Sequence, residues 1–221
     1  MTPSLRIRGA IFDLDGTLLD SMSIWEHFSS AYLRSRGILP PPTLDADVAT
    51  FTLAEAADYL RTTFALPETP EEILRGFDRT VEALYERVLP KPGARELLTT
   101  LRTAGIPVAL ATMTDRPVVE RTLARLGLLS FFDRIFTCAE VGARKSSPAI
   151  YEAALAYLGT RREETAVFED AWYAIKTATA AGFPTVAVYD PSGDARWEKA
   201  VARSALAVRD LRDIRWEDFC R

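Results

Sequence analysis

Two acidic residues, Asp13 and Asp15, are the first candidates for chemistry in this chain. They follow the apolar run Gly9–Phe12 and precede Gly16, a pattern typical of a buried strand that ends in a tight turn. Side chains alternate along a strand, so both carboxylates point the same way if extended geometry continues through Leu14. Like charges at such short range repel unless a cation or a shared proton compensates them. Turn chemistry alone would explain Asp15 but not Asp13.

Five more polar residues accompany later apolar runs. Thr112 closes one run, with Arg116 shortly after it, Lys145 lies in the loop after the next, and Glu169 and Asp170 end a third. In an open α/β sheet, ligands bind outside the carboxyl ends of the strands, and these loops lie at one edge. We therefore expect the carboxylates, the hydroxyl and the lysine to converge there.

Carboxylates, a hydroxyl and a lysine gathered at one sheet edge are suited to phosphoryl transfer. A carboxylate can act as a nucleophile and form an aspartyl phosphate. Its charge repels a phosphate dianion, so a cation must intervene, and Mg²⁺ suits carboxylate oxygens and substrate phosphate. A hydroxyl, backbone N–H groups and a lysine can hold the equatorial oxygens as charge develops. The second aspartate could protonate the leaving oxygen and then activate water.

Each residue taken alone also has an ordinary structural explanation. Thr112 could be a β-branched strand end, and Lys145 could be a solvated loop charge. Arg116 could be an exposed residue in the first turn of a helix, and Glu169-Asp170 could cap the helix that follows. The hypothesis of a joint site rests on their common position at predicted strand ends.

The composition limits the class of protein. The chain has 221 residues, 48% of them hydrophobic, which is enough for one substantial core or for a core with a smaller second domain. The net charge of −4 favours neither a nucleic acid nor an anionic membrane as partner. No apolar run reaches the roughly 18 residues of a membrane span. The two cysteines, Cys138 and Cys220, form no metal-binding or disulfide pattern. From composition, charge and cysteine usage together, we expect a soluble, cytoplasmic protein with a small-molecule partner. The sequence leaves the oligomeric state unknown.

The order of predicted elements indicates an α/β fold. From Asp20 to about Val88 the pattern is helical throughout, and Thr52 and Thr69 each begin a capping box. Strands and helices then alternate, which predicts a parallel sheet covered by helices on both faces. We expect a core of residues 1–19 and 89–221 and an inserted helical bundle of residues 20–88. The predicted strands are 6–12, Pro107–Thr112, Arg134–Cys138, Ala166–Phe168 and Thr185–Tyr189, and the helices between them are Ala94–Ala104, Pro117–Leu126, Pro148–Leu158 and Ala171–Ala181.

These motifs resemble those of the haloacid dehalogenase superfamily. The stretch Asp13–Ser21 is similar to its first motif, and Thr112, Lys145 and Glu169-Asp170 are similar to its second, third and fourth motifs in order. The stretch Lys145–Tyr151 resembles the branch of phosphatases and β-phosphoglucomutase-like proteins. The resemblance covers essentially the whole chain. It implies a Rossmann-like parallel sheet and a helical cap made by the inserted bundle.

The resemblance also implies roles for these residues. Asp13 would be the nucleophile and a metal ligand, and Asp15 the general acid and base, which gives Mg²⁺ its backbone carbonyl. Thr112 and Lys145 would bind the phosphoryl group. Asp170, with Glu169, would complete the metal site. The expected activity is Mg²⁺-dependent hydrolysis of a small phosphorylated metabolite through an aspartyl phosphate.

Two departures from the family pattern leave alternatives open. Where the branch usually has a serine and, a few residues on, a glycine, this chain has Ala171 and the stretch Ala174–Lys176, so an idle binding protein on the same fold is one alternative. A phosphomutase is the other, and it is disfavoured because β-phosphoglucomutase has a cap histidine where this chain has Trp25. His27 lies two residues later, and we interpret it as a bystander. Trp25 and Arg116 are candidates for contact with substrate.

Overall fold

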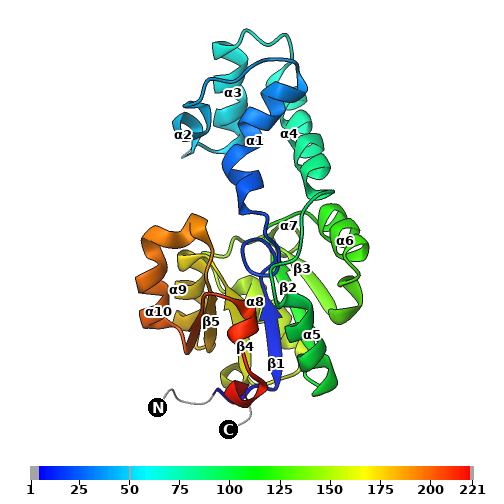
Figure 1. Cartoon of the computed structure of the whole chain (residues 1–221), viewed down its shortest axis with the longest axis vertical. Helices are drawn as coiled ribbons and strands as arrows, with labels where there is room; N and C mark the ends of the chain where they lie inside the picture. Colours follow the sequence, from blue (N-terminus) through cyan, green and yellow to red (C-terminus); the bar gives the residue numbers. More distant parts are fainter. Residues whose placement is uncertain (1–4, 50, 220–221) are drawn as a thin grey trace. The chain divides into compact units, whose positions relative to one another are not determined.

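Short apolar strands form one parallel sheet in the computed structural model, which describes residues 5–49 and 51–219 (Figure 1). Within these residues the sheet has six strands in the order β3-β2-β1-β4-β5-β6, and all neighbours are parallel. The strands are β1 (Gly9–Phe12), β2 (Val108–Thr112), β3 (Arg134–Thr137), β4 (Thr165–Glu169), β5 (Thr185–Val188) and β6 (Leu206–Val208). Every residue of β1, β2, β4 and β5 is buried, as expected for a parallel sheet between helices.

Helices connect the strands and cover both faces of the sheet, which confirms the predicted α/β fold (Figure 1). For example, Ile150, Tyr151 and Ala154 of α8 pack with Ile11 and Val167 of the central strands. The helices that follow β1 and the helical insertion are α5 (Ala94–Thr103), α6 (Arg116–Arg125), α7 (Cys138–Val141), α8 (Ala149–Leu158), α9 (Trp172–Ala180) and α10 (Trp197–Arg203); short 3₁₀ turns span Leu129–Phe131, Arg162–Glu164, Pro191–Arg196, Leu211–Asp213 and Trp216–Phe219.

The elements differ from the predicted ones in several details. The first strand, expected over residues 6–12, begins at Gly9, and two other differences have an identifiable cause. The strand expected to reach Cys138 ends at Thr137, because the Thr137 hydroxyl accepts from the Glu140 N–H at 3.3 Å and begins the short helix α7. The strand β6 was not predicted, because it has only three residues at the sheet edge and two of them, Leu206 and Ala207, are partly exposed. Cys220, one of the two cysteines considered above, lies outside the described residues, and Cys138 is a free thiol.

The chain divides into two compact units. The α/β unit takes in the residues up to Asp20 and from Leu89 onward, and the helical unit is Ser21–Val88. The junction belongs to the α/β unit: the Asp20 N–H donates to the Leu89 carbonyl at 3.0 Å, and the Lys91 N–H donates to the Leu18 carbonyl at 2.8 Å. The chain therefore leaves the sheet domain and returns to it through two hydrogen-bonded segments.

The helical unit consists of α1 (Met22–Ser35), α2 (Leu44–Val48), α3 (Leu53–Thr63) and α4 (Pro70–Tyr85). Its core is apolar and aromatic: the Phe77 ring packs edge-on against Phe28 and Tyr32, with centroids 5.1 and 5.0 Å away. Both predicted capping boxes are confirmed, with Thr52 and Glu55 at the start of α3 and Thr69 and Glu72 at the start of α4.

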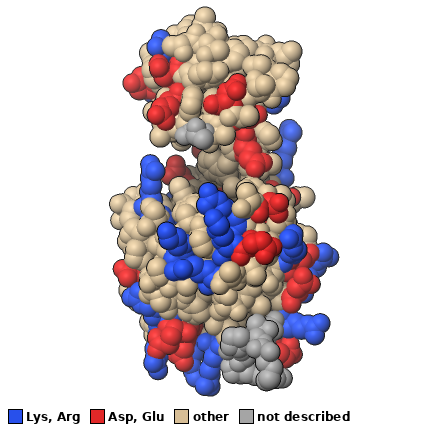
Figure 2. Space-filling model, turned by 90° about the vertical axis from the view of Figure 1, so that its left-hand side faces the viewer, with Lys and Arg blue, Asp and Glu red and all other residues tan. Residues whose placement is uncertain are grey.

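The surface carries charges of both signs. On the side of the α/β unit that bears α10, Lys and Arg gather near the middle and Asp and Glu lie around them (Figure 2). This face is therefore mixed in charge rather than uniformly basic. Within residues 5–49 and 51–219, no helix combines the length and the apolar character that a bilayer crossing requires.

Candidate active site

Asp13 lies immediately after β1, at the carboxyl edge of the sheet. Its N–H donates to the Phe168 carbonyl of the neighbouring strand β4 at 2.9 Å, which fixes the backbone there. The chain then turns: the Leu14 carbonyl accepts from the Leu18 and Leu19 N–H groups, both at 2.9 Å, and Gly16 has φ +77°. A positive φ favours glycine, because a Cβ would be strained in this conformation. The turn, rather than continued strand geometry, sets the direction of the second acid.

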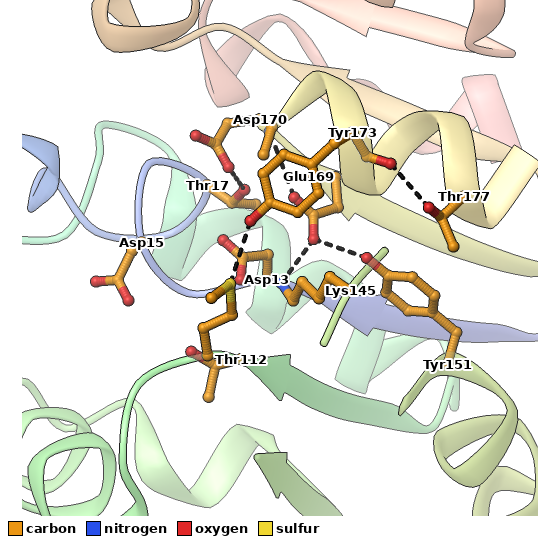
Figure 3. A network of polar contacts seen from close by, with 12 residues as sticks. Asp13, Asp15, Thr17, Thr112, Lys145, Tyr151, Glu169, Asp170, Tyr173 and Thr177 are labelled. Carbon is orange, nitrogen blue, oxygen red and sulfur yellow. Dashed lines mark hydrogen bonds and ion pairs between the residues drawn. The ribbon is translucent and has the colours of Figure 1, made fainter. Parts of the chain in front are cut away.

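Asp15 consequently has different neighbours from Asp13. Its carboxylate accepts a hydrogen bond from the Thr114 hydroxyl at 2.6 Å, and it is half-buried. Figure 3 shows it apart from the other carboxylates, pointing away from them. The expectation that the carboxylates of Asp13 and Asp15 point the same way is therefore wrong. Asp15 is left in a position distinct from that of Asp13, where it can act on a different atom of a substrate.

Three carboxylates converge at the ends of β1 and β4. Oxygens of Asp13, Glu169 and Asp170 all lie within 4.8 Å of one another. Asp13 and Glu169 are buried, and Asp170 is partly exposed. Carboxylate oxygens are the ligands that hard divalent cations prefer, so this cluster fits a divalent metal.

The electrostatics of the three carboxylates also fit a divalent metal. Burial raises the pKa of Asp13 well above its ordinary value, and the charges of Glu169 and Asp170 add to the increase against the opposing Lys145. Burial, with the Glu169 charge, also raises the pKa of Asp170 to about 7. One lysine therefore does not compensate three carboxylates, and a divalent cation would favour their charged forms.

Lys145 is the positive centre of this cluster and is itself 2% exposed. Its Nζ contacts Asp13 Oδ1 and lies 2.6 Å from Glu169 Oε1. Burial alone would lower the pKa of Lys145, but the charges of Asp13 and Glu169 outweigh it and hold the pKa above the usual range. The ammonium thus stays charged beside the predicted nucleophile, where it can hold phosphoryl oxygens.

Further donors hold the two acids that follow β4. The Tyr151 hydroxyl of α8 donates to Glu169 Oε1 at 2.9 Å, and the Ala171 N–H donates to Glu169 Oε2 at 3.4 Å. The Thr17 hydroxyl donates to Asp170 Oδ1 at 3.4 Å. The capping explanation for these acids does not hold, since the residue that precedes α9 as its N-cap is Ala171. Tyr151 was missed as a site residue, because its sequence context reads equally as a buried helix position.

Thr112 ends β2 and is fully buried. Its hydroxyl oxygen accepts from the Thr114 N–H at 3.0 Å, so the orientation of the side chain is fixed and its own proton can be donated to an incoming oxygen. The hydroxyl of Thr114 holds Asp15, as described above. The segment after β2 therefore links a candidate phosphoryl-binding group with the candidate acid and base.

The structure does not bring Arg116 to the acidic cluster. Its guanidinium pairs with Glu140, donates to Glu120 at 3.0 Å and donates to the Ile135 carbonyl at 2.9 Å. Hydrogen bonds from Arg116 lower the pKa of Glu140 to about 2. Arg116 thus joins α6 to β3 and α7, and these contacts give no support to its expected role in substrate binding.

Trp25 and His27 lie on α1 in the helical unit. The Trp25 Nε1–H donates to the Tyr85 hydroxyl at 3.1 Å, and the two rings meet edge-on. His27 Nδ1 lies 3.0 Å from Asp45 Oδ2, in an exposed pair. Both residues have neighbours inside their own unit, and the role of Trp25 toward a substrate stays a prediction.

Tyr173 and Met113 form a contact that sequence reasoning missed. The Tyr173 hydroxyl of α9 donates to the Met113 Sδ at 3.2 Å. Figure 3 shows the Tyr173 ring beside the carboxylates, with its hydroxyl directed toward the sulfur. Partial burial and the charge of Glu169 raise the pKa of Tyr173, so its hydroxyl stays protonated and remains a donor. No local pattern signals this pair, because its members lie 60 residues apart.

Known proteins resemble the chain in sequence over most of its length. Residues 7–182 match the family model of haloacid dehalogenase-like hydrolases. Hexitol phosphatase A of Escherichia coli strain K12 is 32% identical over 196 residues, which cover 87% of this chain and 88% of that protein. Validoxylamine A 7'-phosphate phosphatase of Streptomyces hygroscopicus subsp. limoneus is 30% identical over 227 residues, which cover 94% and 95%.

Solved structures share the fold. A protein described as a putative β-phosphoglucomutase from Thermotoga maritima has a TM-score of 0.80 at 24% identity and covers 93% of this chain and 96% of its own. CbbY of Rhodobacter sphaeroides, solved in complex with phosphate, has a TM-score of 0.75 at 24% identity over 94% and 96% of the two chains. At these identities the likeness establishes the architecture of the sheet and its insertion.

Proposed function

The chain belongs to the haloacid dehalogenase-like hydrolases, and we propose that within this family it is a Mg²⁺-dependent phosphatase of a small phosphorylated metabolite. The observation that carries the proposal is the convergence of Asp13, Glu169 and Asp170 around the buried ammonium of Lys145. Buried charge is costly unless it is paired or binds a ligand. A site with this excess of carboxylate charge is suited to a metal ion together with a phosphate ester.

The proposed reaction assigns one role to each aspartate. An oxygen of Asp13 attacks phosphorus, the bond to the ester oxygen breaks, and an aspartyl phosphate forms. Asp15, oriented by the Thr114 hydroxyl, gives a proton to the leaving oxygen and then takes one from the water that hydrolyses the intermediate. Lys145 and Thr112 bind phosphoryl oxygens as their charge develops.

The metal site would use Asp13, Asp170 and Glu169, together with the backbone carbonyl of Asp15. A bound Mg²⁺ supplies positive charge that lets an anionic nucleophile and a phosphate dianion approach. Glu169 already accepts from Lys145, Tyr151 and Ala171, so its carboxylate is positioned whether or not a metal is bound.

We further propose a phosphorylated polyol or sugar as substrate class and the cytoplasm as location. Two relatives with at least 30% identity are named as phosphatases of a hexitol and of validoxylamine A 7'-phosphate. The helical unit would act as the cap that excludes water and selects the substrate. Trp25 argues against a phosphomutase, because an indole cannot transfer a proton as a histidine can.

The test is phosphate release from a panel of phosphorylated polyols, sugars, nucleotides and small acids, with MgCl₂ and with EDTA. Wild type should release phosphate only with Mg²⁺, and Asp15→Asn should release little. Release that persists in EDTA would contradict the metal role. Silence across the panel would favour an idle binding protein, and interconversion of sugar phosphates without free phosphate would favour a mutase.

Metal binding can also be measured without turnover. A ligand that binds only the folded state stabilises it in proportion to the logarithm of its concentration over Kd. We expect 10 mM MgCl₂ to raise the melting temperature of wild type by about 2–8 °C for a millimolar or tighter site. The increase should be lost in Asp170→Asn and kept in Asp58→Asn, which changes an exposed carboxylate of the helical unit.

A further inference from the structure

Two partly exposed side chains, Met113 and Tyr173, contact each other next to the acidic cluster. We call this pair the bridge. Met113 directly follows Thr112 at the end of β2, and Tyr173 lies in the first turn of α9, three residues after Asp170. The Tyr173 hydroxyl reaches the Met113 sulfur at 3.2 Å. The bridge therefore joins the segment that carries the phosphoryl-binding threonine to the segment that carries the metal-binding acids.

The bridge is both near the charges and open to solvent. The Tyr173 ring lies beside the carboxylates (Figure 3). The charges of Glu169, Lys145 and Asp13 all affect the pKa of its phenol. Yet Met113 is 52% exposed and Tyr173 is 47% exposed. Large apolar side chains at a site of buried charge, left open to solvent, are suited to contact with a ligand.

The hydrogen bond within the bridge is a weak one. A thioether sulfur is a poor acceptor, whereas a hydroxyl oxygen of a polyol is a good one. Exchange of the sulfur for a substrate hydroxyl would therefore strengthen the bond that the Tyr173 proton makes. Both side chains are partly exposed, so a substrate hydroxyl could reach the Tyr173 hydroxyl from the solvent side.

We propose that Tyr173 is a specificity-determining residue, whose hydroxyl leaves the Met113 sulfur to donate to a hydroxyl oxygen on the non-reacting part of a polyol or sugar phosphate. The inference rests on the proposed phosphatase function and deepens it, since it says how the substrate's carbon chain is recognised. A site that donates a hydrogen bond to a substrate hydroxyl discriminates against esters that lack one. The Tyr173 ring would meanwhile pack against the carbons of the chain.

The test compares two esters, a hexitol phosphate and para-nitrophenyl phosphate, the second of which has no hydroxyl on its non-reacting part. The measured quantity is the ratio of kcat/KM for the two esters with Mg²⁺ present. Tyr173→Phe removes only the oxygen, and we expect the ratio to fall about fivefold, as for the loss of one neutral hydrogen bond. The fall should come mainly through KM for the hexitol phosphate.

Two matched variants sharpen the test. Met113→Leu keeps the apolar volume but removes the resting acceptor, so the ratio should not fall. Tyr157→Phe removes the hydroxyl of a similarly exposed tyrosine, which donates to the Asp133 carbonyl at 3.1 Å, away from the acidic cluster. The ratio of this variant should equal that of wild type. Melting temperatures of all three variants check that the fold is kept.

An unchanged ratio in Tyr173→Phe would overturn the inference while phosphatase activity stands. An equal loss on both esters would overturn it as well, because Tyr173 would then act on the phosphoryl group. A fall in Met113→Leu as large as that in Tyr173→Phe would assign the contact to the sulfur and not to the hydroxyl. If wild type hydrolyses neither ester with Mg²⁺, the proposed function fails and this inference falls with it.

Discussion

The two units of the molecule bury different kinds of polar side chain. The α/β unit buries Asp13, Lys145 and Glu169 together. In the described residues of the helical unit, the buried polar side chains are those of serines, such as Ser29 and Ser30, and none is charged. Burying a charge costs free energy that packing does not return by itself. The α/β unit therefore gives up stability at one edge of its sheet for chemistry, whereas the helical unit is built as an ordinary apolar core.

The sharpest test of this comparison separates turnover from stability at Asp13. We expect Asp13→Asn to lower phosphatase turnover by about 10³-fold or more, because the nucleophile is lost. The melting temperature should stay the same or rise, because one of three crowded carboxylates is removed. Turnover is measured on the best ester of the panel, and unfolding by circular dichroism. Asp58→Asn is the control, and undiminished turnover in Asp13→Asn would refute the role.

The second expectation concerns the lysine that the carboxylates surround. Lys145→Met should lower the free energy of unfolding by about 3–5 kcal/mol, because it leaves Asp13 and Glu169 buried without their partner. The raised pKa of Lys145 means that its contribution is fully present below the ordinary lysine pKa and is lost only as pH rises through the higher folded value. Urea unfolding of variant and wild type at pH 7, below the ordinary lysine pKa, should therefore show the full loss. A loss under 1 kcal/mol would mean that the ion pairs of Lys145 contribute no more to stability than exposed salt bridges do.

The helical unit should respond to packing instead. A Cβ added at Gly76 would lie 2.4 Å from Cε2 of the buried Tyr32 ring. Alanine favours a helix over glycine by about 1 kcal/mol, but overpacking a core costs about 1–3 kcal/mol. We expect Gly76→Ala to destabilise the protein by about 1–2 kcal/mol in urea unfolding. Gly193→Ala, where the nearest atom would be 3.7 Å away, is the neutral control, and a stabilised Gly76→Ala would mean that the ring moves aside.

The smallest effect belongs to a helix cap in the same unit. Thr69→Ala should cost about 1 kcal/mol at pH 7, because the N-terminus of α4 loses its capping hydroxyl. Hydrogen bonds from Thr69 lower the pKa of Glu72, so the stabilisation from this carboxylate is present above its ordinary pKa and is lost as pH falls through the lower folded value. The Thr69→Ala variant keeps the backbone N–H that donates to the Glu72 carboxylate, so wild type and variant should lose this contribution alike and differ by a nearly constant amount from pH 7 to pH 3. A difference that disappears at pH 3 would mean that the hydroxyl acts through the charge of Glu72.

The sequence was sufficient to predict the parts of the fold that depend on local pattern. Apolar runs predicted the strands β1 to β5, and helical patterns ended by glycine predicted the helices α5, α6, α8 and α9. The capping boxes at Thr52 and Thr69 were readable because cap chemistry spans only four residues. The tail was harder, since β6 is stabilised by its pairing with β5 and not by its own three residues. Edge strands of this kind depend on tertiary context.

The candidate site was predictable as far as strand ends place residues. Parallel topology brings Asp13, Lys145 and Glu169 together, and this follows from their positions in the chain. The direction of a long side chain does not follow. Arg116 lies four residues after Thr112, but Glu140, 24 residues further on, determines where its guanidinium lies. The Tyr173 and Met113 pair likewise depends on how the start of α9 meets the segment that follows β2, which no spacing reveals.

The paired segments at the junction have a consequence for the modularity of this protein. Because Asp20 and Leu89 are joined by a backbone hydrogen bond of 3.0 Å, the inserted residues begin and end at neighbouring points, as in a long hairpin loop. A two-residue turn such as Asn-Gly can close a gap of this kind. Excision of residues 21–88 is therefore compatible with an unbroken sheet, and the insertion can be lengthened, shortened or exchanged while every strand keeps its neighbours.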